Sequence, residues 1–493
     1  MTSFQTIFQN IFTYDNLNPI SLINGYFLFA FTLFLLVYSF THKDVEQRKW
    51  TLIIFNLLFY YKLTGFLAGV VLLPAIVDYF VAKKMGAIDS ERKKRILLIC
   101  SVSLSLCLLI YFKYTNFFIE LINEINGSSF TTLKIIIPIG ISFYVFRTIS
   151  YVLDVYNEKI EAVEEFSDYL VYMTFFPLMI SGPITRAEKF IPQLNQVNTV
   201  SKEYVNSGFY FIIKGLIKKV IFADYLSIYV STIFTAPEGY TGIENVVAII
   251  CFSIQLYLDF SGYTDIATGI AKILGFDIGI NFNQPFKARS ISDFWRRWHI
   301  SLSDWLKDYI FSPLNFYFRK MKIWGAILAM FVTFFICGIW HGTTLIFILF
   351  GLTHGTVLSW ELTKRSVFIE KKNWLISTLI NQVNWFLTFS FVVITMMAMR
   401  VDTVSTAYGF IRKIWTNPGI QNTHLFFEVQ TAFTCMFILS IILVFLPTKL
   451  KEKIQLYYLQ SSLLIKILLI LFIAQLAIEL QNQNIVPFIY AKY

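Results

Sequence analysis

Apolar runs of about 20 residues, long enough to cross a bilayer, recur along most of the chain, and short polar gaps separate them. The first convincing run is Ile20–Phe40. Further spans are expected at residues 96–118, 133–154, 165–181, 206–223, 243–260, 323–340, 343–362, 374–398, 424–446 and 462–481. The pattern predicts an all-α fold, a polytopic helical membrane protein with about 10–13 membrane helices.

The segment Trp50–Ala82 is an apolar hairpin that is short for two complete spans, so one half is expected to break near Lys62 and Gly65. Basic loops flank it at residues 42–49 and 83–95. Short loops rich in Lys and Arg stay on the cytoplasmic side of a membrane. Both loops are therefore expected to be cytoplasmic, with the N-terminus outside.

One stretch, residues 259–322, contains no clean apolar run of membrane length, although it stays rich in Trp, Tyr and Phe. Within it, residues 281–290 (NFNQPFKARS) cannot be a lipid-facing helix. Pro285 lacks an N–H, and the Asn and Gln side chains need hydrogen-bond partners. Irregular backbone at membrane depth is tolerated only where protein or a water-filled cavity surrounds it. Re-entrant segments, interfacial helices or a cytoplasmic loop are therefore expected here.

A helix is predicted to begin at Ser292 or Asp293. Apolar residues at spacings of three and four would form one stripe along it: Trp295, Trp298, Leu302, Trp305 and Tyr309. By periodicity alone, this is an interfacial amphipathic helix with a belt of aromatic residues. The alternative is the wall of a cavity, with His299 and the adjacent arginines pointing inward.

Composition and charge fit a membrane protein. Of the 493 residues, 56% are hydrophobic and only 15% are charged, whereas soluble domains have about 25% charged residues. The mean hydropathy is +0.62. The net charge of +10 comes from basic residues in loops between apolar runs, which membrane topology explains better than nucleic-acid binding. We expect a multi-pass protein of the cytoplasmic (inner) membrane that contacts membrane lipid and binds no nucleic acid.

The five cysteines lie within or beside apolar runs, with no CxxC motif and no spacing typical of metal ligands. They are expected to be small buried hydrophobic residues, and neither a disulfide framework nor a zinc site is supported. The chain also lacks GxSxG, P-loop and HExxH motifs, which carry other enzyme chemistries. No metal and no bound cofactor are expected.

Five histidines are candidates for acid–base chemistry. His42 lies in a basic loop and His424 follows a polar turn, so both are expected to be solvated. His341 lies at the junction of two long apolar runs, between Gly338 and Gly342. An ionisable side chain at membrane depth is costly and indicates function, although a core histidine bonded to a backbone carbonyl is the alternative.

His299 and His341 form the better pair. On a continuous helix, His354 would face about 220° away from His341, so it is expected to pack and not to react. A neutral imidazole is available as a base near pH 7, and it can deprotonate a hydroxyl that attacks an acyl thioester. Asp259 and Asp265 support a non-enzyme alternative, a polysaccharide or ion transporter in which they couple protons or sodium.

The stretch YLDFSGYTDIATGIAKILGFDIGINFNQPFKARSISDFWRRWHISLSDWLKDYIFSPL, followed by GIWHGTTLIFILFGLTHG, closely resembles the membrane-bound O-acyltransferase family. The match is to its bacterial branch of alginate O-acetyltransferases and teichoic-acid D-alanyltransferases. Three further stretches agree: Ile137–Tyr156, Phe175–Leu194 and Gly215–Leu226. The resemblance covers most of the chain from about residue 20 to 365.

The resemblance implies a ring of membrane helices around a central tunnel, with re-entrant segments at its centre. It implies one integrated domain over residues 1–493, with a motif-bearing core at about 20–365 and extra C-terminal membrane helices at about 370–493. His341 corresponds to the catalytic histidine of the family, and His299 to the second histidine. The other residues expected to line the tunnel or bind the donor are Arg296, Arg297, Trp298, Ser301, Asn283, Gln284 and Trp340.

The implied reaction takes an acyl group from a cytoplasmic thioester, which is either acetyl-CoA or a phosphopantetheine thioester on an acyl-carrier protein. It passes the group to a hydroxyl on the extracytoplasmic side. Two positions depart from the family pattern: Arg147 stands where a glutamine is expected, and Leu178 where a polar residue is common. These departures affect the expected lining of the tunnel.

The expected activity is therefore O-acetyl transfer to an exported or cell-surface polysaccharide. The length of the chain and the FGLTHG motif resemble the alginate-type enzymes, which implies an extracytoplasmic partner similar to SGNH acetyltransferases. The alternative enzyme is a D-alanyl or other acyl transferase fed by a carrier protein.

Overall fold

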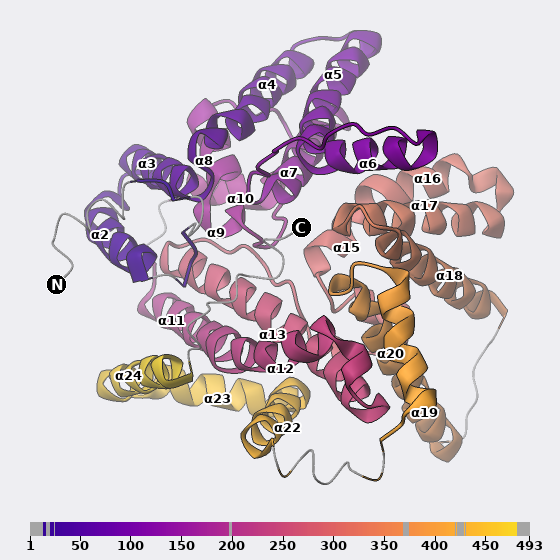
Figure 1. The fold of residues 1–493 in the computed structure, drawn as a ribbon. Coiled ribbons are helices and arrows are strands. Elements are labelled where there is room, and N and C mark those ends of the chain that lie inside the picture. Colours follow the sequence, from indigo (N-terminus) through magenta and orange to yellow (C-terminus); the bar gives the residue numbers. More distant parts are fainter. Residues whose placement is uncertain are drawn as a thin grey trace. The chain divides into compact units, whose positions relative to one another are not determined.

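The computed structural model describes residues 13–15, 20–23, 25–196, 200–367, 374–419, 421, 428 and 430–480. Within these residues the regular structure is helical, and no strand is present (Figure 1). The helices group into two compact units. Unit 1 comprises residues 1–209 and 266–279, and unit 2 comprises residues 210–265 and 280–493. His424 lies outside the described residues.

Unit 1 is built from consecutive helices of the first part of the chain. They are α2 (Gly25–Thr41), α3 (Val45–Thr64), α4 (Ala68–Gly86), α5 (Glu91–Leu109), α6 (Thr115–Asn126), α7 (Ile141–Tyr156), α8 (Phe166–Thr174), α9 (Phe176–Met179) and α10 (Ala187–Leu194). A 3-10 turn, η1 (Gly65–Leu67), separates α3 from α4, and a π-helical turn, η2 (Ile110–Tyr114), joins α5 to α6. Helix α11 (Lys202–Leu216) begins in unit 1 and ends in unit 2.

Unit 2 contains most of the long α13 (Gly242–Ile273) and the helices that follow it. They are α14 (Ile291–Trp295), α15 (Ile300–Leu306), α16 (Ser312–Tyr317), α17 (Ile323–His341), α18 (Leu345–Val367), α19 (Trp374–Met396), α20 (Val404–Thr416), α22 (Thr431–Phe445), α23 (Thr448–Gln460) and α24 (Leu463–Leu480), with α12 (Asp224–Thr235) before α13. The connecting turns are η3 (Ile217–Ala223), η4 (Pro237–Gly239), η5 (Pro285–Lys287), η6 (Lys307–Phe311), η7 (Arg319–Met321) and η8 (Met397–Met399).

Among the described residues, six helical segments are long and apolar enough to cross a membrane: Val45–Val70, Glu91–Asn126, Gly242–Ile273, Ile323–His341, Leu345–Lys364 and Thr378–Met399. Helices α22 and α23, which meet at a bend of 95°, pass the same test when they are taken together as one broken span. Shorter apolar helices occur at Gly25–Thr41 and Leu463–Leu476. A multi-pass helical membrane protein is confirmed.

Several expected spans are divided into shorter helices at proline and glycine. The run at 133–154 becomes helical only at Ile141, after Pro138 and Gly140. Gly140 has a φ of +82°, and a Cβ on it would lie 1.9 Å from the carbonyl oxygen of Met179. The run at 165–181 divides at Phe175 into α8 and α9. The expected break near Gly65 is confirmed, because α3 ends at Thr64 and Gly65 has a φ of +61°.

A cluster of phenylalanines forms part of the core of unit 1. Phe176 of α9 packs edge-on against Phe55 of α3, with ring centroids 5.0 Å apart. Phe55 stacks on Phe34 of α2 at 4.2 Å. Rings paired in this way contribute about 0.5–1.5 kcal/mol beyond the area they bury. The short α9 is therefore held between the two N-terminal helices.

Arg147, one of the departures from the family pattern, has a structural partner in unit 1. Its side chain is 1% exposed and donates hydrogen bonds to the carbonyl oxygens of Tyr172 (3.0 Å) and Met173 (2.7 Å). These carbonyls belong to the last turn of α8, where unpaired C=O groups favour a cation. Arg147 thus caps the C-terminus of α8.

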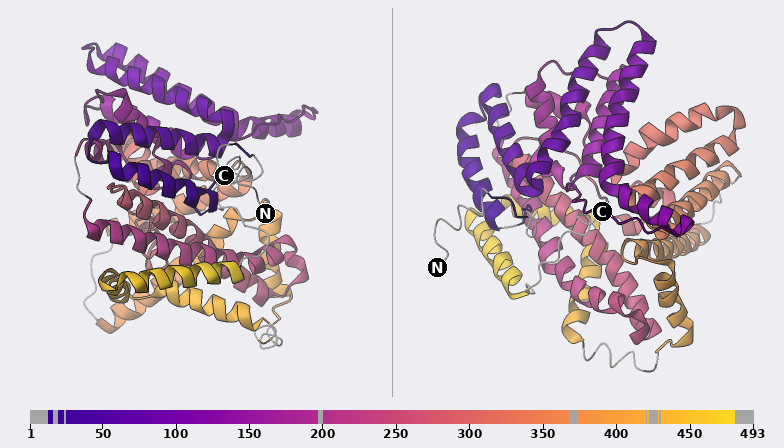
Figure 2. Two further views of the ribbon diagram at one scale, coloured as in Figure 1. Left: turned by 90° about the vertical axis from the view of Figure 1, so that its left-hand side faces the viewer. Right: turned by 45° about the horizontal axis from the view of Figure 1, so that its top comes forward.

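Helices α17 and α18 lie side by side in unit 2 (Figure 1, Figure 2). Glycines permit this close approach. A Cβ on Gly338 would lie 2.4 Å from the carbonyl oxygen of Phe347, and a Cβ on Gly351 would lie 2.3 Å from that of Phe334. Small residues at such contacts are typical of helix pairs in membranes. The packing of α17 on α18 fixes the position of His341 at the end of α17.

The prediction of one continuous helix from residue 293 to 309 is wrong, because the structure divides this stretch. Helix α14 ends at Trp295 and α15 begins at Ile300. His299, at the start of α15, has a φ of +45° and a ψ of 54°, which is the left-handed conformation. Glu361 of α18 fixes the start of α14, because its carboxylate accepts hydrogen bonds from the backbone N–H groups of Ile291 (2.6 Å) and Ser292 (3.0 Å).

Candidate active site

His341 is the last residue of α17 and is 2% exposed. The chain then passes through an extended Gly342 and enters α18 at Leu345. The imidazole lies against the edge of Phe350, with ring centroids 5.6 Å apart, and against the neighbouring Trp340 at 4.7 Å. The end of one membrane helix and the start of the next therefore enclose this side chain.

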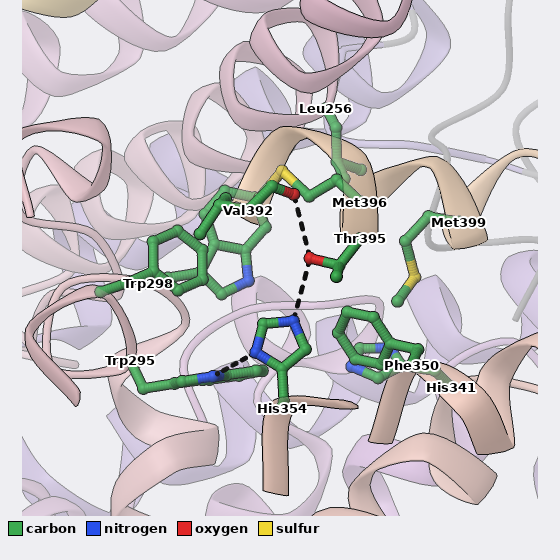
Figure 3. A pocket seen from close by; sticks show the side chains of 11 residues that line it. Leu256, Trp295, Trp298, His341, Phe350, His354, Val392, Thr395, Met396 and Met399 are labelled. Carbon is green, nitrogen blue, oxygen red and sulfur yellow. Dashed lines mark hydrogen bonds between the residues drawn. The ribbon is translucent and has the colours of Figure 1, made fainter. Parts of the chain in front are cut away.

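A narrow cavity opens beside His341 (Figure 3). Side chains from α13, α14, α18, α19 and the turns after α14 and α19 surround it: Leu256, Phe294, Trp295, Trp298, Phe350, His354, Val392, Thr395, Met396 and Met399. The space open to the centre of a water molecule is about 10 Å³, which is enough for about one water. Because the walls are mostly aromatic and aliphatic, the cavity suits an apolar group, and its side chains must move apart to admit a larger ligand.

His354 lies on the wall of the same cavity, and sequence reasoning assigned it no role in the site. The angle that placed it away from His341 assumed one continuous helix. The two histidines instead belong to α17 and α18, with a break between them at residues 342–344. Each helix therefore presents its own histidine to the cavity.

A chain of hydrogen bonds fixes the ring of His354 (Figure 3). The indole N–H of Trp295 donates to Nδ1 at 3.2 Å, so Nδ1 is the acceptor nitrogen, since an indole can only donate. The proton of the neutral ring is therefore on Nε2, which donates to Oγ1 of Thr395 at 3.0 Å. Thr395 in turn donates to the carbonyl oxygen of Val392 at 3.1 Å. With both nitrogens bound, His354 joins α14, α18 and α19 and is not free to act as a base.

His299 is fully buried but does not line this cavity. Its Nδ1 lies 3.4 Å from Oδ1 of Asn281, which also accepts hydrogen bonds from the backbone N–H (3.0 Å) and hydroxyl (2.8 Å) of Ser301. Burial lowers the pKa of His299 to about 3, so the ring is neutral at pH 7. The ring also packs on Trp340, with centroids 6.2 Å apart. Because Trp340 contacts both His299 and His341, it connects the two expected site histidines.

The other expected site residues divide into two groups. Trp298 lines the cavity with His341, and Ser301 shares Asn281 with His299. Four residues lie away from the cavity lining and make other contacts: Arg296, Arg297, Asn283 and Gln284.

The two arginines pair with the same carboxylate. Arg296 lies 3.3 Å and Arg297 3.0 Å from Asp293, and the Arg296 side chain is 62% exposed. Arg297 also donates to the carbonyl oxygen of Asn283 at 3.5 Å, and the amide of Gln284 donates to the hydroxyl of Thr448 at 2.9 Å. These residues form a polar surface next to α14.

The two aspartates of the transporter alternative are both held by lysines. Asp259 lies 2.6 Å from Lys219. Asp265 lies 2.8 Å from Lys214 and 2.6 Å from Lys218. A carboxylate that exchanges protons or sodium has to release its cation, and these are fixed partners. In the described part of the chain, no group of three or more His, Cys, Asp or Glu residues is arranged to hold a metal ion.

Comparison with known proteins gives one family. The model of MBOAT, the membrane-bound O-acyltransferase family, matches residues 3–401. The chain is 34% identical over 339 residues to the probable alginate O-acetylase AlgI of Pseudomonas aeruginosa, covering 68% of this chain and 63% of that protein. It is 30% identical over 434 residues to the peptidoglycan O-acetyltransferase of Helicobacter pylori, covering 81% and 80%. It is 31% identical over 212 residues to the teichoic acid D-alanyltransferase of Bacillus subtilis, covering 41% and 53%.

Proposed function

Because the chain belongs to the membrane-bound O-acyltransferase family, we propose that it transfers acetyl groups to hydroxyls of an exported or cell-surface polysaccharide. The observation that carries the proposal is the position of His341, buried at the junction of α17 and α18 and open to an apolar cavity. The likeness to an alginate O-acetylase and a peptidoglycan O-acetyltransferase supports acetyl as the acyl group and a polysaccharide as the acceptor.

In the proposed reaction, His341 is the general base. It removes the proton from the acceptor hydroxyl as the oxygen attacks the thioester carbonyl. The resulting tetrahedral adduct expels the thiolate of the donor, and the imidazolium returns its proton to that thiolate. The apolar walls exclude bulk water, which would otherwise hydrolyse the thioester.

The surrounding aromatic residues position this base. Trp340 packs against both His341 and His299, so His299 acts on the site through this indole and the backbone around Asn281. Trp295, His354 and Thr395 hold the opposite wall through their hydrogen bonds.

The donor is proposed to be a cytoplasmic thioester, either acetyl-CoA or an acyl-carrier protein. Arg296 and Arg297 lie at a polar surface where guanidinium groups can bind phosphate. An extracytoplasmic partner similar to SGNH acetyltransferases would complete the transfer to polymer, and the cytoplasmic membrane would be the location. No resident cofactor takes part in this scheme.

The second candidate is transfer of D-alanine or another acyl group from a carrier protein. The likeness to a teichoic acid D-alanyltransferase favours it, although that match covers 41% of the chain, against 81% for the peptidoglycan enzyme. The two candidates share His341 and differ in the donor.

The test compares purified membranes that contain the wild-type chain, H341A or H42A, each supplied with labelled acetyl-CoA. His42 is the control because it lies in the loop before α3. H341A is expected to lose transfer of label and H42A to retain it. Parallel reactions with D-alanyl carrier protein identify the donor. Transfer by H341A at the wild-type rate would contradict the proposal, as would a loss of polymer export with unchanged acetylation per chain.

A further inference from the structure

Four lysines from different elements of unit 2 act on one another, and two of them bind the same aspartate. Lys214 lies near the end of α11, Lys218 in η3, Lys287 in η5 and Lys451 in the first turn of α23. Asp265 of α13 binds Lys214 at 2.8 Å and Lys218 at 2.6 Å. The positive charges of Lys218, Lys287 and Lys214 all act on Lys451, and the negative charge of Asp265 acts on it as well. We name these four residues the lysine cluster.

The lysine cluster has more positive than negative charge. Lys287 donates to the carbonyl oxygen of Leu446 at 3.0 Å, which is a neutral partner. The positive charge of Arg297 acts on Lys287 as well. The adjacent Lys219 is different, because it lies 2.7 Å from Asp224 and 2.6 Å from Asp259. Lys219 thus has two carboxylate partners, whereas in the described part of the chain the four lysines of the cluster have one bonded carboxylate, Asp265, among them.

Positive charge in excess of negative charge raises the electrostatic free energy of the cluster, because its side chains are partly buried. The side chain of Lys214 is 33% exposed and that of Lys218 is 13% exposed, and Lys287 and Lys451 are half-buried. Like charges repel more strongly where little water screens them, and a bound anion removes this cost. Phosphate oxygens accept several charge-assisted hydrogen bonds from ammonium donors. We propose that the lysine cluster is a binding site for a phosphate ester.

The surroundings of Lys451 favour the headgroup of an anionic phospholipid as the source of this phosphate. On α23, Leu450, Ile454 and Tyr457 are exposed apolar residues, and Lys449 and Lys453 are exposed as well. Helices that combine exposed apolar and lysine side chains lie at the surface of a bilayer, and basic pockets between membrane helices bind anionic headgroups. The phosphates of an acyl donor have the same chemistry, and that second source rests on the proposed function.

The test uses the full chain and the double variant K287Q/K451Q. Lys214 and Lys218 stay intact because they balance Asp265, and removing a partner of a buried charge destabilises the fold. The control is K449Q/K453Q, which removes the same charge from exposed positions of α23. Equal unfolding temperatures in detergent establish that the variants are folded.

Two ligands are measured directly. Nanodiscs of phosphatidylcholine with or without phosphatidylglycerol supply lipid, and native mass spectrometry counts the phosphatidylglycerol that stays bound. Binding of coenzyme A is compared with binding of pantetheine, which lacks the phosphates. K287Q/K451Q is expected to bind phosphatidylglycerol at least about tenfold more weakly, and K449Q/K453Q to bind it as the wild type does.

Each outcome decides the proposal. Weaker binding of phosphatidylglycerol assigns the phosphate to a lipid. Weaker binding of coenzyme A with unchanged binding of pantetheine assigns it to the donor. The proposal is overturned if K287Q/K451Q binds both ligands as the wild type does, or if K449Q/K453Q loses as much affinity. Because these assays read binding, they remain informative even if the chain transfers no acetyl group.

Discussion

At the scale of single residues, the cavity beside His341 depends on a chain of hydrogen bonds that contains no proposed catalytic group. Trp295 donates to His354, and His354 donates to Thr395. Each of these three side chains comes from a different helix or the turn beside it. Removing one partner leaves a buried donor or acceptor unpaired, so the wall of the cavity is expected to respond to changes that never touch His341.

T395V keeps the size of the side chain but leaves the N–H of His354 without its acceptor. The free energy of unfolding is expected to fall by about 1–3 kcal/mol, and kcat for acetyl transfer to fall because Trp295 is no longer held in place. T395S keeps the hydroxyl and should restore both quantities. Denaturant unfolding and transfer of labelled acetyl are the measurements. If the Val and Ser variants transfer acetyl equally well, Thr395 has no positioning role.

His299 makes stability depend on pH. Its pKa is about 3 in the folded protein, below the ordinary value of about 6.5. The unfolded chain therefore takes up a proton before the folded one does, and the stability that neutral His299 provides above pH 6.5 is lost as the pH falls towards 3. One such group contributes a slope of up to about 1.4 kcal/mol per pH unit in that range.

H299Q removes this titration, so its unfolding free energy should fall less between pH 7 and pH 5 than that of the wild type. Denaturant unfolding in detergent at both pH values gives the two slopes. Identical slopes would mean that His299 is already accessible to protons in the folded chain.

At the scale of the elements, the packing of α17 on α18 decides where His341 lies. Gly338 is one turn before His341 in α17, at the point of closest approach. A side chain there would separate the helices and shift the end of α17. The site is therefore sensitive to residue volume at a position without any reactive group.

G338A places a Cβ 2.4 Å from the carbonyl oxygen of Phe347, so we expect a loss of about 1–3 kcal/mol in stability and a large loss of acetyl transfer. G355A is the matched control on α18, because the nearest atoms to its Cβ would lie 3.5 Å away, at ordinary contact distance. Unfolding and transfer assays on both variants test this. Equal behaviour of the two would show that the helix contact is not tight.

At the scale of the whole molecule, the two basic loops around α3 and α4 define a prediction about orientation in the membrane. Lys43 lies in the turn before α3 and Lys84 in the last turn of α4, and both are exposed. The positive-inside rule assigns both to the cytoplasm. Single cysteines K43C and K84C, in a chain whose own cysteines are replaced by alanine, should react with a membrane-impermeant maleimide only after the cells are opened. If either cysteine is labelled in intact cells, that position lies outside the cytoplasm and the predicted orientation is wrong.

Sequence patterns predicted much of this protein. The apolar runs predicted most long helices, because crossing a bilayer sets their length and composition, and the break near Gly65 could be predicted in the same way. The position of His341 at the junction of two long apolar runs made it the candidate base, and the motifs around it gave the family. Trp298, another residue that the motifs singled out, lines the same cavity as His341.

The tertiary structure decided what depends on residues far apart in the chain. The left-handed backbone at His299 divides the helix that periodicity predicted to be continuous from residue 293 to 309. His354 reaches the cavity because α18 is a separate helix, and its partners Trp295 and Thr395 lie 59 and 41 residues away. The lysine cluster likewise brings together side chains from four elements, two of which bind Asp265. The sequence by itself determines the length and polarity of the helices, because these follow from local composition. Its motifs determine the family. Which side chains share a cavity or a charge follows only from how the helices pack.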